Sequence, residues 1–353
     1  MTLHIIAPTF DPNVVGGAGT VLVELTSRFL RDVPETKIYL NEQTAPRFPE
    51  WRDAIVPVRC GSMKTPSSKA LAVLLLELFG SVAFPREGVC WFPFGSMMPL
   101  WFRGAGVSTI HDTLERDLPG FLPITERLFR SVLLPRTVRM VSVATSSNFS
   151  AQHLRKNYGI EPTVIPLGAT PMPRPSTTRV PSRPYVFYPA NAYPHKNHRF
   201  LLEVWRQHPE LSSIALVFTL GSGIGRLEKP IEESRRAGID VIVTGRVTDE
   251  EVAGLYQNAI CAASPSLYEG FGLLMQEALQ CDCPVLANSS WSAMRETVSS
   301  DYPYFLPLEP SAWAQAILAN PRTTDFNFSR YGIRRTWDEC AKDYEDLFQS
   351  LAR

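Results

Sequence analysis

Two carboxylates flank a glycine-containing turn in the stretch Ser264–Glu277. Glu269 and Glu277 are eight positions apart, and Gly270 and Gly272 lie between them. Glycine lets the backbone come close to a ligand because it has no Cβ. The helix that we expect to begin at Gly272 would present unpaired N–H groups and the positive end of its dipole, which together favour a diphosphate. The carboxylates suit hydroxyl-rich groups, so this stretch predicts a site for a nucleotide sugar.

Two further segments carry side chains that could take part in chemistry. Lys196 lies in the sequence Pro194-His-Lys-Asn-His198, on a turn after an apolar strand-like segment. A compact ammonium group there could neutralise a diphosphate and stabilise a leaving group. His111 and Asp112 follow another strand-like segment. A single histidine is more often structural, but its position at a strand end next to an aspartate favours a functional role.

Alternating strand-like and helix-like segments position these residues. In the first half we expect strands at Leu3–Ala7, Lys37–Leu40, Ala54–Val58, Gly88–Phe92, Gly106–Ile110, Val138–Ala144 and Val164–Pro166. We expect helices at Thr20–Leu30, after a Gly16–Gly19 loop, and at residues 151–158 after a Ser146–Ser150 cap. The second half repeats the alternation, with strands at Tyr185–Tyr188, Ala215–Leu220, Val241–Val243, Ala259–Ala263 and Pro284–Ala287. The alternation predicts two parallel, doubly wound α/β sheets.

A change in composition marks the domain boundary. Residues 168–184 are rich in proline, which is typical of a stiff linker. We therefore predict a Rossmann-like domain at 1–170, a linker at 171–184 and a second Rossmann-like domain at 185–335. A helical pattern runs through Ser329–Ala352, and we expect residues 336–353 to cross back onto the first domain. Ligands of such sheets bind at the carboxyl ends of the strands, which predicts a cleft faced by both domains.

The composition excludes several classes of protein. Of the 353 residues, 44% are hydrophobic and 20% are charged, and the formal net charge is zero, which argues against a nucleic-acid-binding protein. The six cysteines have neither a zinc spacing nor the density of a disulfide framework. The first residues have no basic segment typical of a signal peptide, and no apolar run is long enough to span a membrane. We expect a cytoplasmic protein, with possible peripheral contact at the inner face of the cell membrane.

The Ser264–Glu277 stretch resembles the Glu-x7-Glu motif of retaining glycosyltransferases, in particular family 4 with the GT-B fold. Other segments resemble motifs of the same family in the same order, namely Thr109–Asp112, Val164–Gly168, Pro194–His198, Gly245–Val247 and Pro284–Asn288. The resemblance implies transfer of a sugar from a nucleotide-diphosphate donor to a glycan or lipid-linked acceptor in surface polysaccharide synthesis. It implies no cofactor and no metal, in keeping with the absence of an Asp-x-Asp sequence. The form of the Pro194–His198 turn favours GDP-mannose as the donor.

The resemblance also implies roles for individual residues. His111, Glu269 and Lys196 would act at the reacting centre, and Glu277 would accept hydrogen bonds from the ribose. The donor-binding set would comprise Gly16, Gly17, Arg246, Val247, Gly270, Phe271, Gly272, Leu273 and Glu277. The family usually carries an arginine six residues before the lysine, where this chain has Ala190. Either another cation such as Arg246 compensates, or Lys196 and the helix amides suffice.

Other classes of function stay open at this point. A sugar-nucleotide epimerase or a non-catalytic scaffold could share the GT-B fold, although the epimerases normally lack the complete Glu-x7-Glu block and a scaffold would be expected to have lost key residues. An NAD-dependent oxidoreductase would need its glycine fingerprint directly after the first strand, and Gly16–Gly19 lies too far beyond it. Aromatic residues at 91–102 and the arginines of Phe121–Val141 fit either an acceptor and membrane-contact surface or an ordinary core with a solvated basic face. These arginines are Arg127, Arg130, Arg136 and Arg139.

Overall fold

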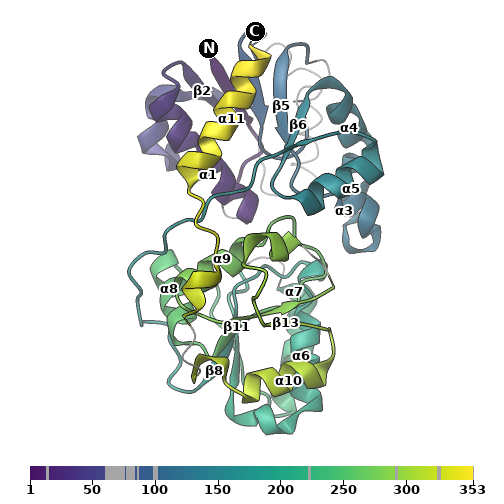
Figure 1. Ribbon diagram of the computed structural model, residues 1–353, viewed down its shortest axis with the longest axis vertical. Coiled ribbons are helices and arrows are strands. Elements are labelled where there is room, and N and C mark those ends of the chain that lie inside the picture. Colours follow the sequence, from purple (N-terminus) through teal and green to yellow (C-terminus); the bar gives the residue numbers. More distant parts are fainter. Residues whose placement is uncertain are drawn as a thin grey trace. The chain divides into compact units, whose positions relative to one another are not determined.

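The chain forms two compact units (Figure 1). The structure is a computed structural model that describes residues 1–12, 16–59, 76, 84–85, 87–97, 102–221, 224–290, 293–323 and 327–352. Unit 1 combines Met1–Gly168 with Arg335–Arg353, and unit 2 is Ala169–Arg334. The chain therefore crosses from one unit to the other twice, near residues 168 and 335.

Unit 1 is built on a parallel sheet that has seven strands within the described residues. Their order is β3-β2-β1-β4-β5-β6-β7. The strands are β1 (Leu3–Ala7), β2 (Thr36–Asn41), β3 (Ile55–Val58), β4 (Val89–Phe92), β5 (Ala105–Thr109), β6 (Ser142–Thr145) and β7 (Thr163–Val164). The residues of β1 and β4 are buried throughout, as expected for strands covered on both faces.

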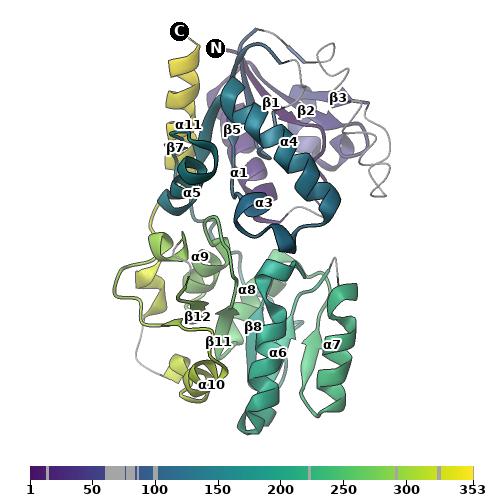
Figure 2. The same ribbon diagram turned by 90° about the vertical axis from the view of Figure 1, so that its right-hand side faces the viewer.

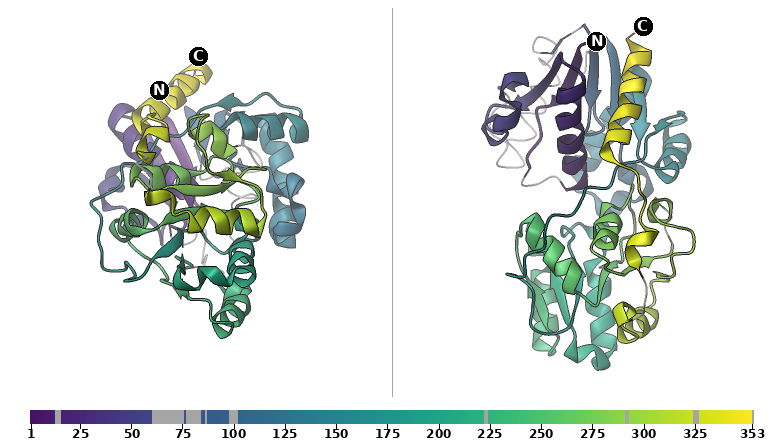
Figure 3. Two further views of the ribbon diagram at one scale, coloured as in Figure 1. Left: turned by 60° about the horizontal axis from the view of Figure 1, so that its bottom comes forward. Right: turned by 60° about the vertical axis from the view of Figure 1, so that its left-hand side comes forward.

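The C-terminal helix completes unit 1. Helix α11 (Trp337–Leu351) lies beside α1 (Gly17–Asp32) against the sheet (Figure 3). The Tyr344 hydroxyl lies 2.9 Å from Thr109 Oγ1 at the end of β5, and Phe348 meets Phe29 of α1 edge-on. Further α-helices among the described residues of this unit are α3 (Leu114–Asp117), α4 (Ile124–Met140) and α5 (Asn148–Tyr158).

Unit 2 contains a second parallel sheet, with six strands among its described residues. Their order is β10-β9-β8-β11-β12-β13. The strands are β8 (Tyr185–Tyr188), β9 (Ala215–Phe218), β10 (Val241–Val243), β11 (Cys261–Ser264), β12 (Val285–Asn288) and β13 (Phe305–Leu306). The helices are α6 (His198–Gln207), α7 (Gly225–Arg236), α8 (Asp249–Asn258), α9 (Leu273–Gln280) and α10 (Pro310–Leu318).

Alternate residues of β8 point into two different hydrophobic cores. Val186 and Tyr188 pack with side chains of α6, α7 and α10. These three helices lie on one face of the sheet (Figure 2). Tyr185 and Phe187 pack with side chains of α8 and α9 on the other face. All four residues are buried because the sheet is covered on both sides. This two-sided packing fixes β8 and β11, which end next to the predicted donor turn.

The structure differs from the sequence-based expectation most clearly in the following segments. A strand is predicted at Val138–Ala144, but α4 continues to Met140 and β6 begins only at Ser142. Gly17–Gly19, predicted as a loop, form the first turn of α1 with Gly16 at the N-cap. The C-terminal helix begins at Trp337, after a short 3-10 turn at Phe328–Tyr331, and not at Ser329. A capping box between Thr336 and Glu339 fixes that start.

Replacement of Gly254 by alanine is expected to destabilise unit 2. Gly254 is a buried residue of α8, and a Cβ at this position would lie 1.8 Å from the backbone oxygen of Ser176. The segment around Ser176 is held there by its N–H, which donates to Glu250 O at 2.8 Å. Backbone must therefore move, and we expect Gly254→Ala to lower the free energy of unfolding by about 2 kcal/mol. Urea denaturation measures this change.

Gly225→Ala is the matched control for that experiment. Gly225 begins α7 in the same unit, and a Cβ there meets nothing within 4 Å. Since alanine is a better helix former than glycine, this variant should be as stable as the parent or slightly more stable. Equal stability of the Gly254 and Gly225 variants would show that the close contact at Ser176 is not a constraint.

Candidate functional site

Two loops at the carboxyl end of the unit 2 sheet are tied together by hydrogen bonds. One loop follows β8 and includes the 3-10 turn Pro194–Lys196, and the other follows β11. The backbone N–H of Leu267 donates to His195 O at 2.7 Å, and Asn197 Nδ2 donates to Pro265 O at 3.3 Å. Asn197 has a positive φ of 57°, which asparagine tolerates better than most residues. The two motif segments therefore form one structural unit.

The buried Tyr188 supports this connection from below. Its hydroxyl donates to Lys196 O at 2.7 Å and lies 3.1 Å from Ser266 Oγ. Asn288 at the end of β12 donates from Nδ2 to Ser266 O at 3.0 Å. The side chains of Tyr188 and Asn288 are both fully buried, so the two loops are anchored to the core of the sheet. The geometry positions Lys196 and Glu269 before any ligand arrives.

Lys196 and Glu269 form an ion pair. Lys196 Nζ donates to Glu269 Oε1 at 2.6 Å, and the side chains are 22% and 17% exposed. Burial by itself raises the pKa of Glu269, but the Lys196 ammonium group and a hydrogen bond from Ser266 outweigh it and hold the pKa below its usual value. The carboxylate is therefore ionised at neutral pH. An ammonium group has three N–H donors, so Lys196 can serve Glu269 and a phosphate together.

Helix α9 begins directly after the glycine turn. Gly272 occupies the N-cap position with φ +97° and ψ 51°, a conformation that side-chain-bearing residues rarely adopt. Within the described part of the chain, no side chain caps this helix start. Phe271 is buried beside Gly272, and Leu273 is the first residue of the helix. The start of α9 can therefore offer backbone N–H groups to an anion.

Glu277 lies one turn into α9. Its Oε2 accepts a hydrogen bond from the Tyr256 hydroxyl of α8 at 3.3 Å. Burial raises the pKa of Glu277, the Tyr256 hydrogen bond lowers it, and Asp249 raises it again, so the net shift is upward. Glu269 and Glu277 thus have different environments: the first carboxylate is paired with a cation, and the second is paired with a phenol.

The other predicted donor-binding residues of unit 2 lie at the same edge of the sheet. Gly245, Arg246 and Val247 follow β10 and precede α8, and Arg246 is exposed. Gly245 has a positive φ of 71°. The parallel strands bring this loop to the edge that also carries Lys196 and Glu269.

The position of the family's usual arginine is buried in this chain. Ala190 is 8% exposed, and its carbonyl lies 3.1 Å from Nε2 of His198, the first residue of α6. Burial lowers the pKa of His198 to about 4, so this imidazole is neutral at neutral pH. His198 therefore does not replace the missing positive charge.

In unit 1, His111 lies after the carboxyl end of β5. Its Nε2 lies 3.0 Å from Pro93 O, a contact in which the imidazole must donate because a carbonyl can only accept. Burial lowers the pKa of His111, so the ring is neutral with its proton on Nε2 and an acceptor lone pair on Nδ1. The neighbouring Asp112 accepts from Arg130 at 2.5 Å.

The structure also describes other residues of unit 1 for which a role is predicted. Gly16 and Gly17 are exposed at the start of α1, after β1. Arg130, predicted as part of a basic surface, is instead largely buried between Asp112 and Glu115, with its Nε 3.0 Å from Glu115 Oε2. Of the aromatic segment predicted at 91–102, residues 98–101 lie outside the described residues, while Trp91, Phe92 and Phe102 belong to the core.

The side chains that support the site residues through hydrogen bonds were not predicted from the sequence. Tyr188 and Tyr256 make supporting hydrogen bonds but lie outside the quoted motifs, and Ser266 lies within Ser264–Glu277 but is assigned no role there. Asn288 belongs to the quoted segment Pro284–Asn288, and its role becomes evident only from its contact with Ser266 O. A polar residue at the end of a buried strand is the signal that could have identified Tyr188 and Asn288.

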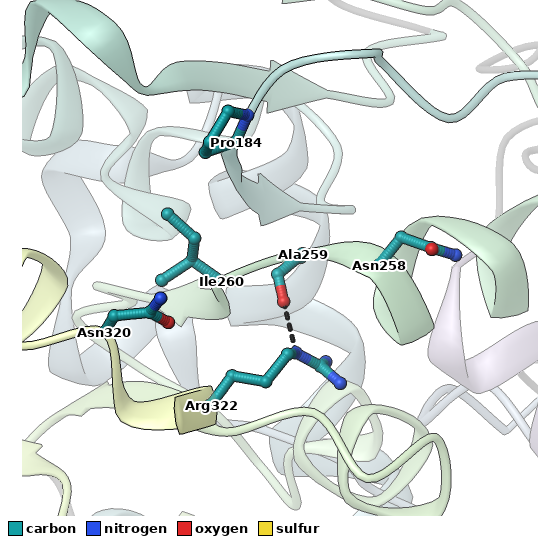
Figure 4. Close-up of a pocket in the computed structure, with 6 residues that line it drawn as sticks. All are labelled: Pro184, Asn258, Ala259, Ile260, Asn320 and Arg322. Carbon is teal, nitrogen blue, oxygen red and sulfur yellow. Dashed lines mark hydrogen bonds between the residues drawn. The ribbon is translucent and has the colours of Figure 1, made fainter. Parts of the chain in front are cut away.

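A separate cavity of about 270 Å³ lies at the opposite edge of the unit 2 sheet (Figure 4). It is lined by Pro184, Asn258, Ala259, Ile260, Asn320 and Arg322. Pro184 and Ile260 directly precede β8 and β11, so the cavity lies at the amino ends of these strands. Arg322 donates from Nε to Ala259 O at 2.5 Å and from an Nη to Tyr256 O at 2.8 Å, which satisfies carbonyls at the end of α8.

Two searches of the described residues gave negative results. They contain no group of three or more His, Cys, Asp or Glu side chains arranged to hold a metal ion. Within the same residues, no helix has the length and apolar character that crossing a membrane requires.

Comparison with known proteins connects unit 2 to a family. Residues 172–318 match the family model for glycosyl transferases group 1. The match covers less than half of the chain and nearly all of unit 2. It includes Lys196, Arg246, Glu269 and Glu277, four charged residues of the predicted donor site.

Two curated relatives are mannosyltransferases. The chain is 30% identical over 212 residues to the MMP alpha-(1->4)-mannosyltransferase of Mycolicibacterium hassiacum, which covers 55% of this chain and 50% of the relative. It is 32% identical over 109 residues to the O-antigen chain mannosyltransferase B of Escherichia coli, which covers 30% of this chain and 28% of the relative. The chain thus aligns with half the length of the first relative and less of the second.

A solved structure resembles the whole chain. Anabaena HepE in complex with UDP and glucose matches with a TM-score of 0.75 at 17% identity, covering 99% of this chain and all of that chain. The chain has the GT-B fold. The predicted fold class, with two Rossmann-like parallel sheets, is confirmed. The family match and the relatives support a glycosyltransferase of this fold.

Proposed function

We propose that this protein is a retaining glycosyltransferase of family 4 that uses a nucleotide-diphosphate sugar. The observation that carries the proposal is the Lys196–Glu269 pair, held at 2.6 Å next to the glycine turn that begins α9. A cation, a helix start and a second carboxylate at one sheet edge match the diphosphate, sugar and ribose of such a donor. The family match over residues 172–318 supports the same reading.

Each part of the donor has a proposed partner in unit 2. Lys196 and the first N–H groups of α9 bind the diphosphate, and Glu269 accepts hydrogen bonds from the sugar hydroxyls. Glu277 accepts hydrogen bonds from the ribose. These roles need preorganised charge and donors at the leaving group, which is a large contribution to catalysis in group transfer. The mannosyltransferase relatives favour GDP-mannose as the donor.

The proposed reaction needs no protein nucleophile. The bond from the sugar carbon to the diphosphate oxygen breaks, and the acceptor oxygen forms a bond on the same face of the sugar. The acceptor proton passes to the leaving phosphate. Catalysis then depends on positioning and on charge stabilisation at the diphosphate. We propose that the reaction proceeds without a metal ion, so activity should persist in EDTA.

A screen of nucleotide sugars tests the function. Thermal unfolding is measured with GDP-mannose, UDP-glucose and the corresponding dTDP- and ADP-sugars, since a ligand that binds the native state raises its apparent stability. We expect GDP-mannose to give the largest shift. NMR of the product then reports whether the anomeric configuration of the donor is retained. Conversion of the donor sugar without any acceptor would instead indicate an epimerase.

His111 is proposed to hydrogen-bond the donor sugar near the reacting carbon. Since its Nε2 proton is directed to Pro93 O, Nδ1 is the atom available to accept from a hydroxyl. We expect His111→Ala to lower kcat about tenfold while changing the donor KM much less, because one hydrogen bond near the transition state is lost. An increase in KM alone, with kcat unchanged, would place His111 in ground-state binding only.

A second proposal concerns the acceptor. Helix α4 exposes three apolar side chains at four-residue intervals, Ile124 at 69%, Leu128 at 59% and Val132 at 67%. They form a stripe along one face of the helix, and Arg127 and Arg139 are exposed on the same helix. An apolar stripe with nearby arginines suits peripheral contact with an anionic membrane surface that carries a lipid-linked acceptor.

Sedimentation with vesicles tests this surface. We expect the protein to bind vesicles of phosphatidylglycerol and phosphatidylcholine, and Leu128→Asp to reduce that binding. Leu318→Asp is the matched control, because Leu318 is an exposed apolar residue of unit 2 outside the stripe. Equal losses for both variants would remove α4 from the membrane contact.

A further inference from the structure

We infer that Tyr256 is a positioning residue for the donor site, which holds the Glu277 carboxylate in the orientation that meets the ribose hydroxyls. The inference deepens the proposed function and rests on it. Tyr256 belongs to α8 and Glu277 to α9, so the contact joins two helices that are separated by the whole donor turn. The sequence motif includes Glu277 but not Tyr256.

The position of the Tyr256 ring is fixed by its surroundings. The residue is fully buried in the core between the sheet and helices α8 and α9. Phe187 of β8 meets its ring edge-on, with the ring centroids 5.0 Å apart. A ring confined in this way presents its hydroxyl in one direction, and that hydroxyl donates to Glu277 Oε2 at 3.3 Å. One carboxylate oxygen is thereby anchored, which leaves Oε1 of Glu277 to accept from a ligand.

The surroundings of Glu277 oppose its ionisation. Burial raises the pKa of Glu277, and the Asp249 carboxylate on α8 raises it further. The half-buried Cys281 thiol, one turn later on the chain, also interacts with Glu277. Among these surroundings, the Tyr256 hydroxyl is the group that favours the ionised carboxylate. Its hydrogen bond therefore orients the Glu277 carboxylate and favours the ionised form, which accepts a hydrogen bond from a ligand hydroxyl.

Tyr256→Phe removes the hydroxyl and keeps the ring. We expect the affinity for GDP-mannose and UDP-glucose, measured by calorimetry on the full chain, to fall about fivefold at neutral pH. As the pH is lowered, we also expect binding by the variant to decline at a higher pH than binding by the parent, because loss of the Tyr256 hydroxyl raises the pKa of Glu277. Nucleotide sugars are suitable probes because they lack the terminal phosphate that titrates at about pH 6 in free nucleotides.

Tyr185→Phe is the matched control. Tyr185 is buried in the same core, and its hydroxyl donates to Leu255 O of α8 at 2.8 Å. Like Tyr256→Phe, this variant loses one buried phenol hydrogen bond that involves α8. The lost bond does not involve Glu277. We expect its nucleotide-sugar affinity and pH profile to match those of the parent, even if its melting temperature falls as much as that of Tyr256→Phe.

Glu277→Gln distinguishes failure of the inference from failure of the proposed function. If Glu277→Gln weakens binding while Tyr256→Phe behaves like Tyr185→Phe, the donor site stands and Tyr256 does not position it. Equal losses in both tyrosine variants would show a general effect of loosening α8 and would overturn the inference in the same way. If Glu277→Gln leaves affinity unchanged, the proposed role of Glu277 in the donor site is itself wrong.

Discussion

Lys196→Ala is expected to reduce the affinity for the nucleotide-sugar donor and kcat/KM by about 100-fold. Lys196 is the cation that the structure positions beside the glycine turn, with Nζ 2.6 Å from Glu269. Its removal takes one charged donor from the diphosphate, and a single preorganised donor at a developing anion contributes effects of this size. It also leaves Glu269 largely buried without its cation, so the pKa of Glu269 should rise. Protonation of this carboxylate would reduce its repulsion of the diphosphate and so offset part of the loss in affinity.

The chain offers a matched control for this variant. Lys229 and Glu233 form an exposed pair one helical turn apart on α7, with a distance of 3.8 Å. Lys229→Ala removes the same side chain from the same unit, but an exposed pair contributes little to stability. We expect donor affinity to be unchanged in Lys229→Ala. Calorimetric titration that gave equal affinities for the parent and Lys196→Ala would remove Lys196 from the donor site.

Glu277→Gln is expected to weaken nucleotide binding about 30-fold. The substitution keeps the shape of the side chain but replaces one acceptor oxygen by an NH2 group, and hydrogen bonds to charged groups are stronger than those between neutral groups. In the parent, the Tyr256 hydroxyl donates to Glu277 Oε2 at 3.3 Å, and in the variant the glutamine amide takes the place of this carboxylate. We expect the loss to depend on the ribose hydroxyls. The parent should bind a 2′-deoxynucleotide more weakly than the matching ribonucleotide, and this difference in affinity should be smaller for the variant.

The control for this prediction is Glu233→Gln on α7. It makes the same chemical change at an exposed carboxylate of the same unit. We expect no change in affinity for either the ribose or the deoxyribose ligand. If the parent and Glu277→Gln discriminated equally between the two sugars, Glu277 would not contact the ribose.

The elements nearest the proposed donor site were predictable from sequence. The strand Tyr185–Tyr188 has the predicted bounds, because an apolar run is followed by turn residues. The turn at Gly270–Gly272 was also predictable, since φ +97° at Gly272 requires the freedom of glycine. These features are local, and local sequence encodes them.

Features that depend on tertiary contacts were not predictable. A strand is predicted at Val138–Ala144, yet α4 continues past Pro135 to Met140. The Thr137 hydroxyl donates to Leu133 O and accepts from Met97 N, so packing against a distant loop supports the helix beyond the proline. Arg130 looked like a surface residue because its carboxylate partners, Asp112 and Glu115, lie 18 and 15 positions earlier in the sequence.

Hydrogen exchange in the presence of a nucleotide sugar tests the donor site most directly. The free chain and the chain saturated with GDP-mannose are compared by mass spectrometry after digestion into short peptides. We expect amides of Gly270–Met275 to gain the most protection, with a second gain at His195–His198, because we propose that the backbone N–H groups at the start of α9 bind the diphosphate. Protection confined to other segments, such as those around the Arg322 cavity at the opposite edge of the sheet, would contradict it.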